Sequence, residues 1–96
     1  MRYLIDIDGT ICRTNGNDYK KAKPILDNIS KINELYHTGH EIIYYTSRGM
    51  SSGIDWYGFT WKQLISWGCL FLDLRCDKPS FDIIVDDKAK RIEELF

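Results

Sequence analysis

Two aspartates, Asp6 and Asp8, follow a short apolar run near the start of the chain. Because side chains two residues apart in an extended strand point to the same side, the two carboxylates would lie together at the end of that strand. Like charges beside apolar surface are tolerated when a cation, a hydrogen-bond network or a shared proton compensates them. Hard oxygen ligands of this kind suit Mg²⁺. The pair therefore indicates a metal-dependent site.

The two residues that follow the aspartates fit this interpretation. Gly9 lets the backbone turn sharply, and the hydroxyl of Thr10 can donate hydrogen bonds near whatever binds at the strand end. The alternative is an exposed turn without a site, since Asp-Gly is also a common turn dipeptide.

Two later apolar runs also end in polar residues. Residues 41–45 are followed by Thr46, Ser47 and Arg48, and residues 81–85 are followed by Asp86 and Asp87. Lys78 stands just before the last run and supplies a cation on the loop that enters it. Ligands of an open parallel α/β sheet bind at the carboxyl ends of its strands. We therefore expect the polar residues of all three runs to meet in one place.

The order of these residues resembles the four short motifs of the haloacid dehalogenase superfamily of phosphohydrolases. Residues 6–10 match the first motif, Thr46 the second, Lys78 the third, and Asp86 with Asp87 the fourth. The first and fourth motifs are the specific ones, and together the matches span residues 6–87. The resemblance implies an α/β fold with a small Rossmann-like parallel sheet of about four strands between helices.

The resemblance also implies a role for each motif. Asp6 would be the nucleophile that forms an aspartyl-phosphate, and Asp8 would be the general acid and base of both half reactions. Thr46 and Lys78 would hold the transferring phosphoryl group. An acid at position 8 favours phosphatase or phosphomutase chemistry over the dehalogenase and transport-ATPase branches.

The implied cofactor is Mg²⁺, held by Asp6, the backbone carbonyl of Asp8, and Asp86. Asp87 would bind a water on the metal or orient Lys78. The residues expected to contact the substrate are Gly9, Thr10, Ser47 and Arg48.

A chain of 96 residues has room for one small domain. We expect a single unit over residues 1–96 without the cap that many relatives carry, because the two segments where caps enter are short. An open site of this kind would be covered, if at all, by another subunit, so a homo-oligomer is expected. A mutase would need a cap to shield its intermediate from water, which favours a phosphatase.

Periodicity and turn residues predict the elements that position the site. Ile29, Ile32 and Leu35 recur at helical spacing, with Pro24 before them and Gly39 after them. Thr60 is the expected N-cap of a second helix. The expected strands are residues 2–8, 41–46, 70–74 and 82–86, and the expected helices are residues 25–37, 60–67 and 89–96.

The identity of the substrate depends on weaker signals. A sugar phosphate is the first choice, because the lead-in to the second motif resembles phosphatases of capsule and lipopolysaccharide sugar biosynthesis. The rival enzyme is a polynucleotide 3′-phosphatase, and the alternative outside catalysis is a phosphate-binding interaction module. A net charge of −1 disfavours extended nucleic-acid binding.

The sequence leaves the function of two surface features open. The aromatic segment at residues 56–61 could be a subunit interface, a rim around the leaving group, or cover for the sheet. A basic group could attract an anionic leaving group or form a solvated face. Its members are Arg13, Lys20, Lys21 and Lys23, together with Arg48 after the second motif.

The cysteines and hydropathy indicate a compartment. Cys12, Cys69 and Cys76 are odd in number and lack the spacing of a zinc site, so reduced thiols are expected. No apolar run has the length of a membrane span or of a signal peptide. We therefore expect a cytoplasmic protein with no membrane partner.

Overall fold

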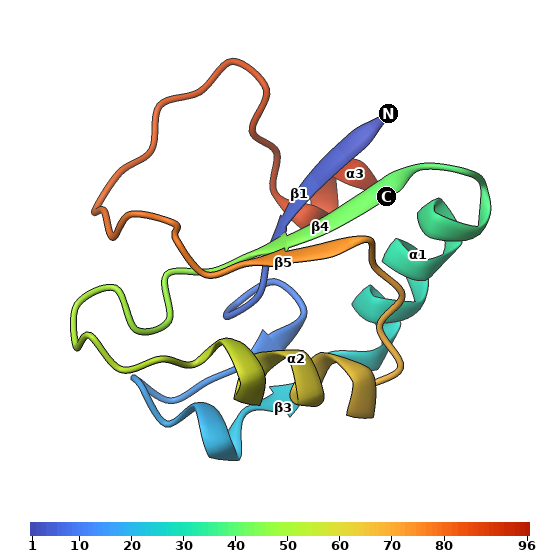
Figure 1. Cartoon of the computed structure of the whole chain (residues 1–96). Coiled ribbons are helices and arrows are strands. Elements are labelled where there is room, and N and C mark those ends of the chain that lie inside the picture. Colours follow the sequence, from blue (N-terminus) through green and yellow to red (C-terminus); the bar gives the residue numbers. More distant parts are fainter.

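Three parallel strands form the main sheet, in the order β1 (Arg2–Asp6), β4 (Glu41–Tyr45) and β5 (Asp73–Arg75). The structure, a computed structural model, describes residues 1–96 (Figure 1). Asp6 pairs with Tyr45, and Tyr45 pairs with Arg75. The carboxyl ends of all three strands therefore lie side by side at one edge of the sheet.

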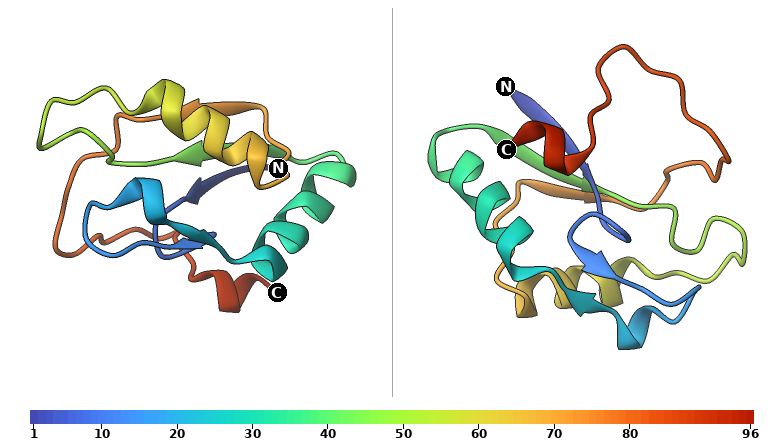
Figure 2. Two further views of the ribbon diagram at one scale, coloured as in Figure 1. Left: turned by 90° about the horizontal axis from the view of Figure 1, so that it is seen from below. Right: turned by 180° about the vertical axis from the view of Figure 1, so that it is seen from behind.

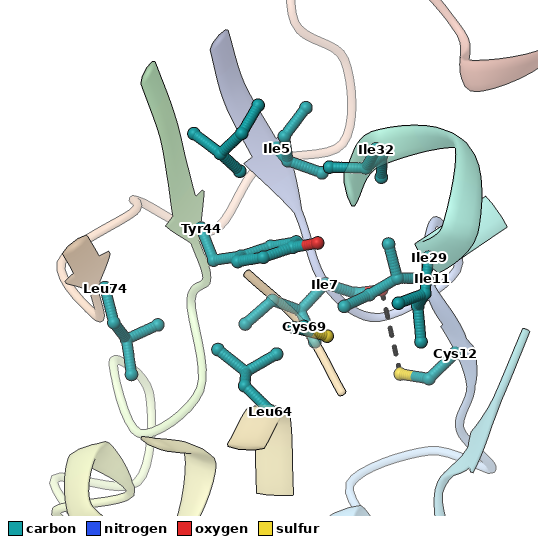
Figure 3. Close-up of a cluster of buried hydrophobic side chains, with 11 residues drawn as sticks. Ile5, Ile7, Ile11, Cys12, Ile29, Ile32, Tyr44, Leu64, Cys69 and Leu74 are labelled. Atoms are coloured by element: carbon teal, nitrogen blue, oxygen red, sulfur yellow. Dashed lines mark hydrogen bonds between the residues drawn. The ribbon is translucent and has the colours of Figure 1, made fainter. Parts of the chain in front are cut away.

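Two helices connect these strands and cover one face of the sheet. They are α1 (Leu26–His37), between β1 and β4, and α2 (Tyr57–Ser66), between β4 and β5. Their side chains meet in one buried cluster around Tyr44, with Ile29 and Ile32 from α1 and Leu64 from α2 (Figure 3). Because the crossovers between neighbouring parallel strands are right-handed, a sheet that grows in one direction receives both helices on the same face.

A flap follows β1 and returns to the start of α1. It consists of β2 (Cys12–Arg13), a 3₁₀ turn at Tyr19–Lys21, and β3 (Lys23–Pro24), which pairs antiparallel with β2. The flap lies alongside α2 (Figures 1 and 2). The short segment after the two aspartates therefore forms a small flap and no cap domain.

The expectation of about four parallel strands is wrong. Residues 82–86 form no strand, and the side chains of Ile83 and Val85 are 81% and 94% exposed. The segment between β5 and the last helix instead loops away from the sheet (Figure 1). A run of three apolar residues flanked by acids does not by itself specify a partner strand, and β1 remains at the edge of the sheet.

Other boundaries differ by a few residues. The third strand is Asp73–Arg75 rather than residues 70–74, and the last helix, α3, is only Ile92–Leu95. The second helix begins at Tyr57, so Thr60 lies inside it and is fully buried instead of capping it. None of the helices combines the length and the apolar composition that a membrane span needs.

Candidate active site

The two aspartates lie where β1 ends and the chain turns. Asp6 is the last residue of β1, and Gly9 has a φ of +87°, a conformation that glycine adopts without strain. The backbone N–H groups of Thr10 and Ile11 both donate to the carbonyl of Ile7, at 3.1 and 3.0 Å. This tight turn holds the Asp8 carboxylate near that of Asp6.

A cleft of about 270 Å³ opens at this edge of the sheet. Both carboxylates line it, and the loop that follows β5 forms its other side. Its lining residues are Asp6, Asp8, Thr46, Ser47, Lys78, Pro79, Ser80 and Phe81. The structure thus brings together residues of the first three matched motifs, whereas the polar residues that follow the last apolar run do not join them.

Lys78 supplies the cation nearest to Asp6. Its Nζ donates to Oδ1 of Asp6 at 3.2 Å and lies 5.1 Å from the ring centroid of Phe81. The backbone N–H of Lys78 donates to the carbonyl of Thr46 at 3.2 Å, which ties this loop to the end of β4. Partial burial of Asp6 raises the pKa of its carboxyl above the ordinary value, although Lys78 opposes that shift.

Asp8 has a different partner. Arg48 donates to both of its carboxylate oxygens, from Nε to Oδ2 at 3.0 Å and from Nη2 to Oδ1 at 2.8 Å. The hydroxyl of Thr14 donates to Oδ1 at 2.6 Å, and the thiol of Cys12 lies 3.5 Å from the same oxygen. Burial alone would raise the pKa of the Asp8 carboxyl, but the bonds from Arg48 and Thr14 outweigh burial and hold that pKa below its ordinary value.

Arg48 does not line the cleft, so the expectation that it contacts substrate does not fit its position. Its side chain is fully buried, and its third nitrogen, Nη1, donates to Thr60 Oγ1 at 3.2 Å and to Gln63 Oε1 at 2.7 Å. Sequence reasoning missed Thr14, Thr60 and Gln63. The available signal was the pair Thr60 and Gln63, which stand three residues apart on the side of α2 that also carries the buried Leu64.

Asp86 and Asp87 lie outside this site. Both are exposed, within the irregular segment that leads to α3, and neither lines the cleft. No group of three or more His, Cys, Asp or Glu side chains is close enough together to hold a metal ion. Asp6 and Asp8 are instead each compensated by a basic side chain, so the arrangement in this structure does not fit the expected Mg²⁺ site.

Gly9 and Thr10 shape the turn rather than the cleft. Neither lines the cleft, and the carbonyl of Thr10 accepts a hydrogen bond from Asn28 Nδ2 at 2.9 Å. Ser47 does line it, as expected, and Ser80 and Phe81 are further lining residues that the sequence did not single out.

The aromatic segment lies away from the cleft. The ring of Trp56 packs edge-on against Tyr19 of the flap at 5.0 Å and against Phe59 at 5.3 Å. Tyr57 and Trp61 are partly exposed. The basic side chains of the flap, Arg13, Lys20, Lys21 and Lys23, are exposed, and none of them lines the cleft.

Comparisons with known proteins identify the fold. No family model matches the chain, and no curated protein matches it. The crystal structure of an MCSG target from Vibrio cholerae superposes with a TM-score of 0.85 at 24% sequence identity. The match covers 97% of this chain and 85% of that one. This similarity supports the arrangement of strands and helices described above.

Proposed function

We propose that this chain is a phosphomonoesterase of the haloacid dehalogenase type, with Asp6 as its nucleophile. One observation carries the proposal: two aspartates at the carboxyl end of β1 share a cleft with Thr46, Ser47 and Lys78. A carboxylate, a hydroxyl-lined pocket and a cation at this edge are what transfer of a phosphoryl group to an aspartate requires. The resemblance of the motifs to that superfamily supports the same reaction.

The reaction would proceed in two displacements. In the first, Asp8 takes up a proton from solvent, against the lowering of its pKa by Arg48 and Thr14. A carboxylate oxygen of Asp6 then attacks phosphorus, the bond from phosphorus to the leaving oxygen breaks, and Asp8 gives that proton to the leaving oxygen. In the second, Asp8 takes a proton from water as the water oxygen attacks phosphorus. The bond between phosphorus and Asp6 then breaks and releases inorganic phosphate.

Lys78 and Thr46 would act on the transferring group. The ammonium of Lys78 reduces the repulsion between the Asp6 carboxylate and an incoming phosphate dianion, because it lies 3.2 Å from Asp6. Thr46 is buried at the base of the cleft, and its hydroxyl already accepts a hydrogen bond from the backbone N–H of Arg48 at 3.2 Å. Its hydroxyl hydrogen can be donated to a phosphate oxygen without adding charge.

A small sugar phosphate is the substrate class that we propose. The cleft holds about 270 Å³, slightly below the usual range of ligand sites, and Ser47, Ser80 and Phe81 are among its lining residues. Hydroxyls and an aromatic face suit a polyhydroxylated leaving group. The chain would act in the cytoplasm, where its three free cysteines stay reduced.

The resemblance also predicts a requirement for Mg²⁺, but the residues of the cleft do not form the expected metal site, so no step above depends on the ion. The direct test measures phosphate release from sugar phosphates, nucleotides and 3′-phosphorylated oligonucleotides, with Mg²⁺ and with chelator. Release of phosphate by the natural chain and not by Asp6→Asn supports the phosphatase. If no substrate is hydrolysed under either condition, the phosphatase proposal fails and a binding module is favoured. Faster release from oligonucleotides than from sugar phosphates favours the polynucleotide 3′-phosphatase.

A further inference from the structure

We propose that Arg48 is a positioning residue that fixes the orientation of the Asp8 carboxylate, and that α2 and the flap hold Arg48 in place. The catalytic consequence of this inference rests on the proposed function. The contacts of Arg48 on which it is based do not depend on the identity of the substrate. Arg48 was expected to bind substrate, and the structure gives it a different task.

The contact between Arg48 and Asp8 is bidentate. Nε and Nη2 of Arg48 each donate to a different oxygen of Asp8, at 3.0 and 2.8 Å. Two parallel bonds between a planar guanidinium and a planar carboxylate fix the rotation of the carboxylate as well as its position. A lysine in the same place would offer one point charge and no such control.

The remaining contacts of Arg48 leave it turned away from substrate. Nη1 donates to Thr60 and to Gln63, so all three nitrogen atoms of the guanidinium are engaged within the protein. The side chain has no exposed surface. A substrate in the cleft therefore meets Asp8 and not Arg48.

The flap completes the surroundings of Arg48. The ring of Tyr19 lies over the guanidinium, with its centroid 4.5 Å from Cζ. Gln63 bridges the two, because its Oε1 accepts from Arg48 at 2.7 Å and its Nε2 donates to the Tyr19 carbonyl at 2.8 Å. The edge-on contact of Trp56 with Tyr19 supports the flap from the side of α2. Arg48 thus joins three segments that are distant in the sequence.

This arrangement has a consequence for the reaction. Asp8 must meet a leaving oxygen in one half reaction and a water in the other, and both steps depend on the direction in which its carboxylate points. Loss of Arg48 would let the carboxylate rotate while the cleft that binds the substrate stays lined by the same residues. The expected defect is therefore in kcat, with little change in KM.

The kinetic test compares Arg48→Lys and Arg48→Ala with the natural chain. We expect kcat to fall by about 10²-fold with KM changed less than about threefold, since small misplacements of a reacting group have effects of this size. Free guanidinium should restore part of the kcat of Arg48→Ala. The matched control is Arg2→Ala, because Arg2 forms an exposed ion pair with Glu41 at 2.8 Å, at the other end of β1. The control should show neither the defect nor the rescue.

Two kinetic results would overturn the proposal. A rise in KM with unchanged kcat in Arg48→Lys would make Arg48 a substrate contact. A natural kcat in both Arg48 variants would mean that Asp8 needs no such support.

A second measurement does not depend on activity. In ¹⁵N NMR spectra of the natural chain, the Nε–H of Arg48 should exchange slowly with water, because the group is buried and bonded to Asp8. The signal should shift in Asp8→Asn and stay in place in Asp6→Asn, and Gln63→Leu should speed its exchange. Exchange as fast as that of the exposed Arg2, or no response to Asp8→Asn, would refute the arrangement. If the natural chain releases no phosphate, the proposed function fails and this spectrum alone judges the inference.

Discussion

Asp6 and Asp8 stand two residues apart, and each is paired with a basic side chain, yet the two surroundings differ. Asp6 receives one bond from Lys78, which lies on the irregular loop after β5, and its side chain is 40% exposed. Asp8 receives two bonds from a wholly buried Arg48 that helix α2 and the flap enclose. The pKa of the Asp6 carboxyl is raised by burial, whereas that of the Asp8 carboxyl is lowered by its hydrogen bonds.

The difference in partners, though not that in pKa, suits the two tasks that we propose. A nucleophile that must approach phosphorus benefits from a partner that can move toward the phosphate, and Lys78 is a flexible side chain of this kind. A proton-transfer group benefits from a fixed direction, which the guanidinium of Arg48 gives. Two identical residues on one turn thereby become chemically distinct through contacts supplied by distant parts of the chain.

The largest expected effect comes from Asp6→Asn. An amide does not form the covalent intermediate, so phosphate release should fall below detection. The melting temperature should stay equal or rise, because the substitution removes a partly buried charge. Phosphate assays and thermal unfolding measure the two effects, and persistent turnover would show that Asp6 is not the nucleophile.

Asp8→Asn should have the next largest effect. General acid–base assistance is worth about 10²–10⁴-fold, and both half reactions would lose it. Single-turnover kinetics with a substrate that has an activated leaving group should show the loss mainly in the second half reaction, because such a group leaves without a proton. Equal activity of Asp8→Asn and the natural chain would exclude this role.

The variants Arg48→Met and Lys78→Met compare how much each ion pair contributes to the unfolding free energy. Removal of Arg48 leaves the partly buried Asp8 without its partner and should cost about 3 kcal/mol of unfolding free energy. Removal of Lys78 should cost less than about 1 kcal/mol of unfolding free energy, because its partner Asp6 is substantially exposed. The same substitution should lower kcat/KM by about 10²-fold, because the charge that stabilises the transferring group is lost. Urea unfolding compares the two variants, and equal costs would contradict the difference in their surroundings.

The smallest expected effect is a difference in pH dependence. Asp8, whose pKa is lowered in the folded state, contributes stability above its ordinary pKa, and that stability is lost as the pH falls through the folded value. Asp6, whose pKa is raised, acts in the opposite direction, since folding is favoured while it is protonated and the advantage is lost as the pH rises. Relative to the natural chain, Asp8→Asn should therefore lose less stability on acidification below about pH 4, and Asp6→Asn should gain stability as the pH rises. The melting temperature of each variant is compared with that of the natural chain between pH 3 and 7. If the two differences changed with pH in the same direction, the assignment would be wrong.

The parts of the fold that carry local signals were predictable. The isoleucines of α1 recur at helical spacing, and glycine follows the helix, so its limits were predicted within one residue. The strand expected at residues 82–86 had only a short apolar run as evidence. Whether such a run pairs with β1 depends on tertiary contacts that the run itself does not encode.

The same distinction holds for the site. The places of Asp6, Asp8 and Thr46 in the cleft were predictable, because each ends or follows a strand with a clear apolar pattern. Lys78 reaches the cleft from the loop after β5 and not from the entry to a further strand. The task of Arg48 was not predictable, since its partners Asp8 and Gln63 are 40 and 15 residues away and only folding brings them together. Asp86 and Asp87 were expected in the site through the strand that the structure lacks.

The unpaired edge of β1 has a consequence for the behaviour of this chain at high concentration. An exposed strand edge offers free backbone donors and acceptors, and the exposed apolar run Ile83, Ile84 and Val85 is a β-prone segment in the same molecule. Pairing of that run with the β1 edge of another copy would begin fibril-like aggregation. Acidic side chains flank this run on both sides, and their mutual repulsion opposes pairing between copies. They are Asp82, Asp86 and Asp87. Salt that screens these charges should therefore promote aggregation. Asp86 and Asp87, which lie outside the cleft, would thus help to keep the chain dispersed.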